Sequence, residues 1–353
     1  MNHNKKLLPA WLLISIDIVL IAVYVAGFYR FYYLTPRQLE SSGIKTGQGS
    51  TAARNWDQEN NIPQEVTADD AGTANGTDKT QSQNGSDNTE ANNSENLRAK
   101  FAEHFTETAV STENSYTSND IAIQINKYTE GSGGNIVTYY VADIYVADIT
   151  CLQSGFADNT YGIGYADDLL NMDEEFNAIL AINGDYYGNG QYGVVIRNGE
   201  VYRKKNGDSD VCVLYYDGTM KTYSPDEFDV DAAIADGAYQ AWSFGPGLLD
   251  DSGNRITDFN TNGRIKDVNP RTAIGYYEPG HYAFVVVDGR QSGYSIGLSL
   301  TQFSKLFEEL DCEAAYNLDG GKSSGMTFQD ALVNRPSGGG REVSDCIMIK
   351  EVQ

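Results

Sequence analysis

The chain has 353 residues, and its 49 acidic side chains exceed its 25 basic ones, for a formal net charge of −24. A folded nucleic-acid-binding protein needs a basic face, so this balance argues against that class, and we expect no nucleic-acid partner. Three segments of different composition follow one another along the chain.

The first segment predicts a membrane anchor. The 23 residues from Leu7 to Tyr29 contain one charged residue, Asp17. At about 1.5 Å rise per residue they match the roughly 30 Å hydrocarbon core of a bilayer, whereas a cleaved secretion signal has a shorter apolar stretch. Lys5 and Lys6 precede this span. We therefore expect a cytoplasmic tail at 1–6 and a single-pass cell-membrane protein whose folded domain is extracellular.

Residues 30–118 are predicted to form a disordered tether. Within it, residues 41–96 contain four large apolar side chains, Ile44, Trp56, Ile62 and Val66, among Gly, Ser, Thr, Asn, Gln and acidic residues. Such a segment buries too little apolar surface to offset its chain entropy. A short amphipathic helix is predicted at 97–105, where Leu97, Phe101 and Phe105 recur every four residues.

Residues 119–353 are predicted to form one folded domain. Short apolar runs rich in Val, Ile and Tyr indicate strands, at 121–125, 139–149, 178–182, 211–216, 273–277, 283–287, 314–318 and 346–349. Two segments indicate helices, 166–177 and 300–310, the second with a capping box at Ser299 and Gln302. The expected fold class is α+β, a mixed β-sheet core with a βαβ crossover and few helices, preceded by one transmembrane helix.

The most informative stretch begins with a predicted hairpin around Pro279-Gly280. If the hairpin is symmetric about that turn, Arg271 lies opposite Asp288. A helix and a further strand follow, and strand–helix–strand normally makes a right-handed crossover to a parallel strand. Parallel strands end at one edge of a sheet, so we expect Asp319 to emerge near Asp288. Asn183 and Asp185 follow another apolar strand and are expected at the same edge.

These residue types indicate glycan chemistry. Most glycoside hydrolases use two neighbouring carboxylates as catalytic groups. Arg271, Arg290 and Arg341 supply planar donors suited to phosphate, and the Gly-rich loop after Asp319 has backbone N–H groups for an anion. An anionic sugar phosphate therefore fits this acidic chain better than a nucleic acid does.

Rival motifs are incomplete. The match to G-x-S-x-G at 321–325 has no histidine after it, which argues against a serine esterase. The four cysteines are far apart and read as free core thiols rather than zinc ligands. Asn206-x-Asp208-x-Asp210 lacks the Gly and Glu of a calcium loop. We expect no metal or cofactor, with calcium kept as an alternative.

These stretches resemble the phosphodiester glycosidase family, which includes N-acetylglucosamine-1-phosphodiester alpha-N-acetylglucosaminidase and bacterial proteins labelled as exopolysaccharide biosynthesis proteins. The resemblance is carried by Asn183-Gly-Asp-Tyr-Tyr187, Arg271-Thr-Ala-Ile-Gly275, Asp288-Gly-Arg290, Asn317-Leu-Asp-Gly-Gly-Lys-Ser-Ser324 and Arg341-Glu-Val-Ser-Asp345. It implies an α+β domain that hydrolyses a sugar-1-phosphodiester. The chain departs from the family pattern at Tyr186 and Tyr187, which are usually Phe, and at Lys322, which is usually Gly.

As a hypothesis, Asp288 and Asp319 share the catalytic roles of acid and base or nucleophile. The predicted substrate-binding residues are Asn183, Asp185, Arg271, Thr272, Arg290, Asn317, Gly320, Gly321, Ser323, Ser324 and Arg341. Arg271 and Arg290 are expected to hold the phosphate, and Asn183 a sugar hydroxyl. Ser323, Ser324 and the Gly320 and Gly321 amides would orient the anion or the sugar.

The expected function is a membrane-anchored extracellular hydrolase that cleaves a sugar-1-phosphodiester bond in a cell-surface glycan or related polymer. Its partners would be a carbohydrate or sugar-phosphate polymer as substrate, and the membrane through the N-terminal helix. One alternative is a non-catalytic glycan-binding or exopolysaccharide-assembly module that uses the same cleft. Another is a cell-wall hydrolase that cuts a different bond.

Overall fold

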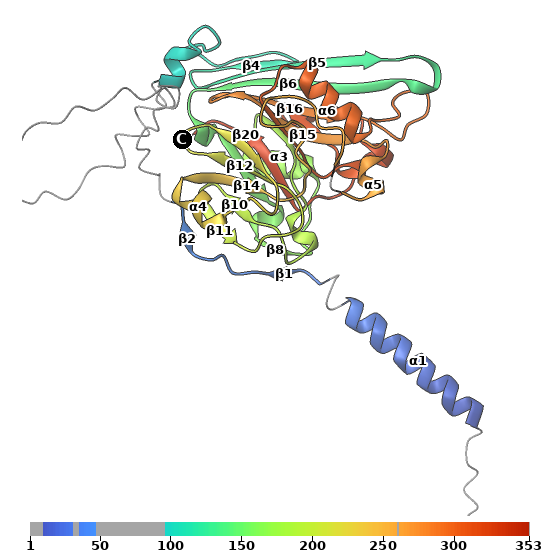
Figure 1. The fold of residues 1–353 in the computed structure, drawn as a ribbon. Coiled ribbons are helices and arrows are strands. Elements are labelled where there is room, and N and C mark those ends of the chain that lie inside the picture. Colours follow the sequence, from blue (N-terminus) through green and yellow to red (C-terminus); the bar gives the residue numbers. More distant parts are fainter. Residues whose placement is uncertain (1–9, 31–34, 47–95, 260, 353) are drawn as a thin grey trace, which may run out of the picture.

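The computed structural model describes residues 10–30, 35–46, 96–259 and 261–352. The predicted cytoplasmic tail at 1–6 and the middle of the predicted tether lie outside these ranges. The domain is built mostly from β-sheets, with few helices (Figure 1).

The largest sheet carries the predicted hairpin at its centre. Its seven strands, in spatial order, are β17 (Ala314–Asn317), β15 (Arg271–Glu278), β16 (His281–Val287), β6 (Val137–Val146), β5 (Ile121–Glu130), β4 (Ser115–Thr117) and β3 (Val110–Ser111). Successive side chains of β16 alternate between two hydrophobic clusters: Phe284 and Val286 lie in one, Val285 and Val287 in the other. Both faces of this sheet are therefore buried, which explains its continuous apolar runs.

Two further large sheets belong to the domain, in addition to a two-stranded sheet. A five-stranded sheet has the order β19 (Ala331–Leu332), β18 (Met326–Phe328), β9 (Leu180–Asn183), β20 (Asp345–Ile349) and β7 (Leu152–Phe156). A six-stranded sheet has the order β13 (Met220–Tyr223), β12 (Val211–Tyr215), β14 (Ala238–Trp242), β10 (Val195–Arg197), β11 (Glu200–Arg203) and β2 (Ile44–Lys45). The main core joins side chains of all three sheets, including Phe284, Ile182 and Trp242.

Helices cover the outer faces. The helix α6 (Leu300–Glu309) has the predicted capping box between Ser299 and Gln302, and its Phe303 and Phe307 pack on the outer face of the seven-stranded sheet. Further helices of the domain are α3 (Leu169–Phe176), α4 (Val230–Ala235) and α5 (Gly263–Lys266). All eight predicted strand segments overlap observed strands, both predicted helices form, and the four cysteines are free and buried as expected.

The predicted mixed sheet with parallel neighbours is wrong. Every strand pair among the described residues is antiparallel. The unit β16–α6–β17 does return the chain in the same direction, but β15 lies between its two strands and pairs antiparallel with both. The inserted strand comes from earlier in the chain, so the local strand–helix–strand pattern did not reveal it. Asp288 and Asp319 still leave the same edge of the sheet, as predicted.

The predicted hairpin register is wrong by one residue. Arg271 pairs with Val287 rather than Asp288, because the register shifts between Tyr276 and Glu278, next to the turn. Such a bulge places one extra residue on one strand. A shift of one residue moves a side chain to the opposite face of the sheet, so Arg271 does not face the Asp288 carboxylate.

Both ends of the predicted tether are ordered against the domain. Residues 35–46 form β1 (Arg37–Gln38), which pairs with β8 (Gly162–Ile163), and β2, which pairs with β11. Leu39 packs on an aromatic cluster that includes Tyr161. At the other end, residues 96–100 are helical, Leu97 and Phe101 are buried, and β3 and β4 extend the large sheet. Backbone pairing with exposed strand edges supplies the order that side-chain composition does not predict.

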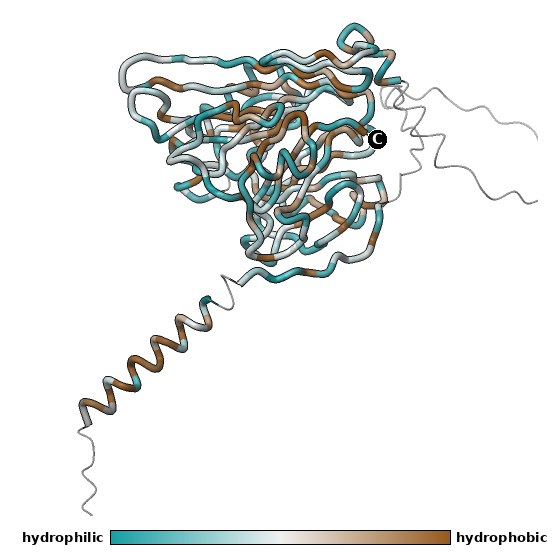
Figure 2. Tube along the Cα trace, turned by 180° about the vertical axis from the view of Figure 1, so that it is seen from behind, coloured by the Kyte–Doolittle hydropathy of each residue, from teal (hydrophilic) through white to brown (hydrophobic). Residues whose placement is uncertain are grey.

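The helix α1 (Ala10–Tyr29) lies apart from the sheets, and it is largely hydrophobic (Figures 1 and 2). Its side chains from Ile14 to Tyr29 are exposed. In the part of the chain that the structure describes, no helix combines the length and apolarity needed to cross a membrane. The predicted span at 7–29 begins outside the described residues and stays a prediction.

Candidate functional site

A largely buried carboxylate that still reaches the surface lies in the loop that follows β17. Asp319 Oδ2 accepts hydrogen bonds from Ser323 Oγ at 2.5 Å and Arg341 Nη2 at 2.6 Å, and Arg341 Nε donates to the same Ser323 Oγ at 2.6 Å. The side chain of Asp319 is 12% exposed and that of Arg341 is 42% exposed. Three predicted residues thus form one polar cluster, in which Arg341 is exposed to solvent and Asp319 and Ser323 are buried.

The ring of Tyr186 forms one wall of this cluster. The Arg341 guanidinium carbon lies 5.1 Å from the centre of the Tyr186 ring, within reach of a cation–π contact. Tyr186 has φ of +60°, in the left-handed region, and it is 37% exposed. Left-handed backbone costs a non-glycine residue roughly 1–2 kcal/mol. The fold therefore holds Tyr186 in an unfavourable conformation that places its ring beside Arg341.

The two other predicted arginines differ in accessibility. Arg290 is exposed, donates to Asn269 Oδ1 at 2.6 Å, and lies against Gly321, where an added Cβ would be 3.1 Å from its Nη1. Arg271 is 3% exposed and donates to the carbonyls of Leu298 and Asp267 at 2.9 and 2.5 Å. Burial and the neighbouring Arg290 lower the pKa of Arg271 to about 10. Arg271 therefore holds the segments of Asp267 and Leu298 in place and is not available to contact a ligand.

The glycine-rich loop uses its amides internally. Gly320 N donates to Asp319 Oδ1 at 3.0 Å, and Gly321 N donates to Pro270 O at 3.0 Å. The predicted use of these two amides as an anion cradle is therefore not seen. Gly321 has φ of +71°, which favours glycine, and its turn brings Ser323 back to Asp319.

Four predicted substrate-binding residues, Asn183, Thr272, Asn317 and Ser324, are buried. Asn183 is fully buried; its Nδ2 donates to Asp319 O at 2.7 Å and its Oδ1 accepts from Thr272 Oγ1 at 2.8 Å. Asn317 Nδ2 donates to Gly245 O at 2.8 Å, and Ser324 is 1% exposed. Asn183 thus ties β9 of one sheet to the loop after β17 of another. Its side chain is occupied, so the predicted bond to a sugar hydroxyl is not supported.

Asp288, the second predicted catalytic residue, is 1% exposed. Its Oδ1 accepts from Asn334 Nδ2 at 2.8 Å, its Oδ2 accepts from Tyr294 OH at 2.8 Å, and Arg335 N lies 3.1 Å from both oxygens. Burial raises the pKa of Asp288 above its ordinary value, and these donors oppose the rise. The backbones of Asp288 and Asp319 are separated by β15, roughly 10 Å for two strand spacings. We assign Asp288 to holding the loop 334–335 rather than to contact with a substrate.

A buried ion cluster under the site was not predicted. Arg197 Nη2 lies 2.8 Å from Asp185 Oδ1 and 3.0 Å from Asp345 Oδ2, and all three side chains are at most 2% exposed. Asp345 also accepts from the backbone N–H of Tyr186 at 3.3 Å, and Asp185 accepts from that of Tyr187 at 3.1 Å. The cluster therefore fixes the turn that carries Tyr186. Arg197 is the last residue of β10, a position where an arginine is often exposed, so the sequence gives no sign that it is buried.

This cluster predicts a pH-dependent stability. Burial and the charge of Asp185 raise the pKa of Asp345 to about 7, so the folded chain binds a proton at Asp345 between about pH 4 and pH 7 that the unfolded chain lacks. Its stabilising contribution is present below the unfolded pKa and is lost as the pH rises through 7. The stability of the wild type relative to Asp345→Asn should thus fall across this window, by up to about 1.4 kcal/mol per pH unit.

Urea denaturation of the two chains at pH 4 to 8 measures this difference. Asp217→Asn, a change in an exposed turn, serves as the control and should show no such slope. A wild-type-to-Asp345→Asn difference that stays constant with pH would mean that Asp345 keeps one protonation state throughout.

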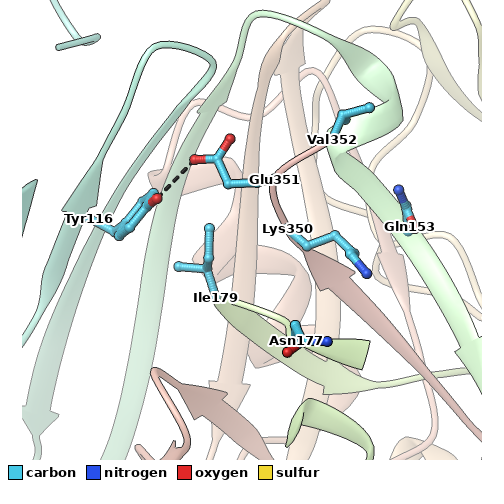
Figure 3. Close-up of a pocket in the computed structure, with 7 residues that line it drawn as sticks. All are labelled: Tyr116, Gln153, Asn177, Ile179, Lys350, Glu351 and Val352. Atoms are coloured by element: carbon cyan, nitrogen blue, oxygen red, sulfur yellow. Dashed lines mark hydrogen bonds between the residues drawn. The ribbon is translucent and has the colours of Figure 1, made fainter. Parts of the chain in front are cut away.

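Two cavities of the domain are not lined by the Asp319 cluster. One of about 390 Å³ is lined by Tyr116, Gln153, Asn177, Ile179, Lys350, Glu351 and Val352 (Figure 3). It lies at the end of β9 and β20 opposite to Asn183 and Asp345. Its polar groups are partly paired, since Tyr116 donates to Glu351 and Lys350 donates to Phe176 O. A second cavity of about 140 Å³ borders Arg197. Among the described residues, no group of three or more His, Cys, Asp or Glu side chains could hold a metal ion.

Part of this chain is similar in sequence to a known family and to a known protein. Residues 176–350 match the family model described as phosphodiester glycosidase (NAGPA). The SPbeta prophage-derived uncharacterized protein YomE of Bacillus subtilis strain 168 is 32% identical over 196 residues, which cover 54% of this chain and 30% of that protein. The chain thus spans less than a third of the length of this curated relative.

Solved structures share the fold. The catalytic domain of zebrafish N-acetylglucosamine-1-phosphodiester alpha-N-acetylglucosaminidase, auto-inhibited by its pro-peptide, aligns with a TM-score of 0.54 and 21% identity over 73% of this chain and 93% of that one. A hypothetical protein from Synechocystis aligns with a TM-score of 0.51 and 14% identity over 65% and 62%. The matched region contains Asp319, Ser323 and Arg341, and this region, residues 176–350, belongs to the phosphodiester glycosidase family.

Proposed function

We propose that this chain hydrolyses the bond between a sugar C1 and a phosphodiester oxygen in a cell-surface glycan or related polymer. The observation that carries the proposal is the Asp319 carboxylate, which is oriented by Ser323 and Arg341 and is less buried than the other aspartates of the site: it is 9% exposed, against at most 3% for Asp185, Asp288 and Asp345. The family match supports the reaction class.

The chemistry requires one accessible carboxylate. Phosphate groups are stable anions at neutral pH, so the departing phosphomonoester needs no proton from a general acid. Asp319 would take a proton from water as the water oxygen bonds to C1. The C1–O bond breaks with its electron pair going to the phosphate oxygen. This scheme explains how the site can act although Asp288, expected as the second catalytic carboxylate, is buried.

The arginines would bind the phosphate. Arg341 and Arg290 are exposed and flank the Asp319 loop, and a guanidinium offers two parallel donors to phosphate oxygens. The Tyr186 ring would keep Arg341 in place and offer an aromatic face to the sugar. Arg271 is buried and would contribute by holding the neighbouring segments of Asp267 and Leu298 in place.

The test is a 31P NMR assay on the purified full chain with a methyl diester of an α-sugar-1-phosphate in water enriched in oxygen-18. Cleavage at C1 releases labelled free sugar and unlabelled methyl phosphate. Label in the phosphate would mean that a phosphoryl bond is cut, which contradicts the proposal. Binding without turnover across a panel of sugars would instead identify a glycan-binding or exopolysaccharide-assembly module.

We also propose that residues 7–29 anchor the chain in the cell membrane with the domain outside. The support comes from sequence: the span has one charged residue, and Lys5 and Lys6 precede it. Resistance of the full chain to alkaline carbonate extraction, together with cleavage of the domain by protease added to intact cells, tests this placement. Release of the chain by carbonate would contradict it.

A further inference from the structure

Exposed cations without carboxylate partners gather around the Asp319 loop. Lys127, Arg290, Lys322 and Arg335 are exposed, and among the described residues no Asp or Glu oxygen lies within 4 Å of their charged nitrogens. Elsewhere on the domain several lysines are paired with carboxylates, namely Lys45 with Glu200, Lys100 with Glu278, Lys204 with Asp231 and Lys305 with Glu309, whereas Lys205 lies over the Tyr192 ring. In a chain of net charge −24, unpaired cations in one place are available for an external anion.

Two of these cations are held on the faces of one aromatic ring. Lys127 Nζ, from β5, lies 5.9 Å from the centre of the Tyr294 ring, and the guanidinium carbon of Arg335 lies 5.1 Å from it. Lys127 also lies 5.5 Å from the Tyr140 ring. Tyr294 is itself fixed by its hydrogen bond to Asp288. The ring therefore fixes the positions of two charges that come from distant parts of the chain.

Hydrogen bonds connect this pair to the candidate site. Asn334, next to Arg335, donates to Asp288 Oδ1 at 2.8 Å and to Ser324 O at 3.1 Å. Ser324 follows Ser323, which bonds Asp319. On the same loop Arg290 lies against Gly321, and Lys322 Nζ would be 3.5 Å from a Cβ at Gly338. The cations thus form a continuous series from Lys127 and Arg335, through Arg290 and Lys322, to Arg341.

We propose that Lys127, Arg335, Arg290, Lys322 and Arg341 form a basic track that binds successive anionic groups of an extended polyanionic glycan. The proposal rests on the proposed function and specifies its substrate as a polymer with repeated charges rather than a single sugar phosphate. Arg341 and Arg290 contact the group at the reacting bond. Lys127 and Arg335 contact a neighbouring repeat, too far along the track to touch a small substrate.

The experiment measures equilibrium binding of the full chain to fluorescein-labelled poly(glycerol phosphate) by anisotropy. The double variant Lys127→Gln/Arg335→Gln keeps side chains that can pack on Tyr294 and removes two charges. Binding should weaken by about tenfold, the combined effect of two exposed ion pairs, and should weaken further with added salt. Lys205→Gln/Lys305→Gln is the matched control: Lys205 lies over Tyr192, the charge change is equal, and binding should be unchanged.

Three further ligands define the substrate class. Polygalacturonate carries carboxylates, so it distinguishes a track for any polyanion from a track selective for phosphodiesters. If binding of poly(glycerol phosphate) or of polygalacturonate depends on Lys127 and Arg335, the track is supported. Neutral dextran should not bind. Three results would overturn the proposal. The two double variants could weaken binding equally, or neither could weaken it. The chain could also bind single-stranded DNA more tightly than both polymers. Because no turnover is required, binding with the expected pattern but without sugar release would refute the proposed function alone.

Discussion

Replacing Asp319 by Asn is expected to lower sugar release by about 100- to 10,000-fold, the range typical for loss of a general acid or base. Asn preserves the size of the side chain and an oxygen that can accept from Ser323 and Arg341, but it cannot take a proton. The measurement is the rate of free-sugar formation from a sugar-1-phosphate methyl diester, with the midpoint of thermal unfolding recorded alongside.

Asp250→Asn, a change at an exposed turn carboxylate, is the matched control and should keep wild-type activity. The buried Asp288 offers the sharper comparison. Asp288→Asn should act mainly through stability, because a buried carboxylate that accepts from Tyr294, Asn334 and Arg335 is replaced by a group that also donates. If Asp319→Asn remained active and a fully folded Asp288→Asn were inactive, the two assignments would be reversed.

Replacing Arg197 by Met is expected to destabilise the domain by about 3–5 kcal/mol, as found when one partner of a buried ion pair is removed. Arg197 is the shared partner of Asp185 and Asp345, and all three side chains are at most 2% exposed. Without it, two carboxylates face each other with no positive charge between them. Urea denaturation gives the change in the free energy of unfolding.

The triple variant Asp185→Asn/Arg197→Met/Asp345→Asn removes all three charges and should recover part of the lost stability, because no uncompensated charge remains buried. Arg255→Met is the control: Arg255 is 44% exposed and pairs with Glu308 at 3.6 Å, so its loss should cost about 0–1 kcal/mol. Equal losses for Arg197→Met and Arg255→Met would show that the buried cluster does not stabilise the turn of Tyr186.

Strand and helix positions could be predicted from local patterns, and their pairing could not. Short apolar runs identified β15, β16 and β17, and the capping box identified the start of α6. The insertion of β15 between β16 and β17 and the bulge beside Tyr277 depend on contacts between segments far apart in the chain. A bulge is a local accommodation of packing, and no turn residue of the Pro279-Gly280 hairpin indicates it.

For the candidate site, the sequence likewise predicted the motifs but not which of their side chains are buried. The motif around Asp319 and Ser323 was recognised from sequence, and Arg341 was expected near it. Which of the predicted residues are accessible depended on burial: Asn183, Arg271 and Asp288 are polar and belong to the motifs, yet they lie at most 3% exposed. Their hydrogen bonds to other loops give these side chains structural roles.

By itself, the sequence determined the division into an apolar N-terminal stretch, a polar segment and a β-rich domain, and the presence of carboxylates and arginines in short motifs. These properties depend on composition and on neighbours along the chain. Only the tertiary structure decided that Asp319 is less buried than Asp288, that Arg197 pairs with two buried acids beneath Tyr186, and that Lys127 and Arg335 share one ring. The physical reason is that burial, pairing and charge compensation depend on residues brought together from different sheets.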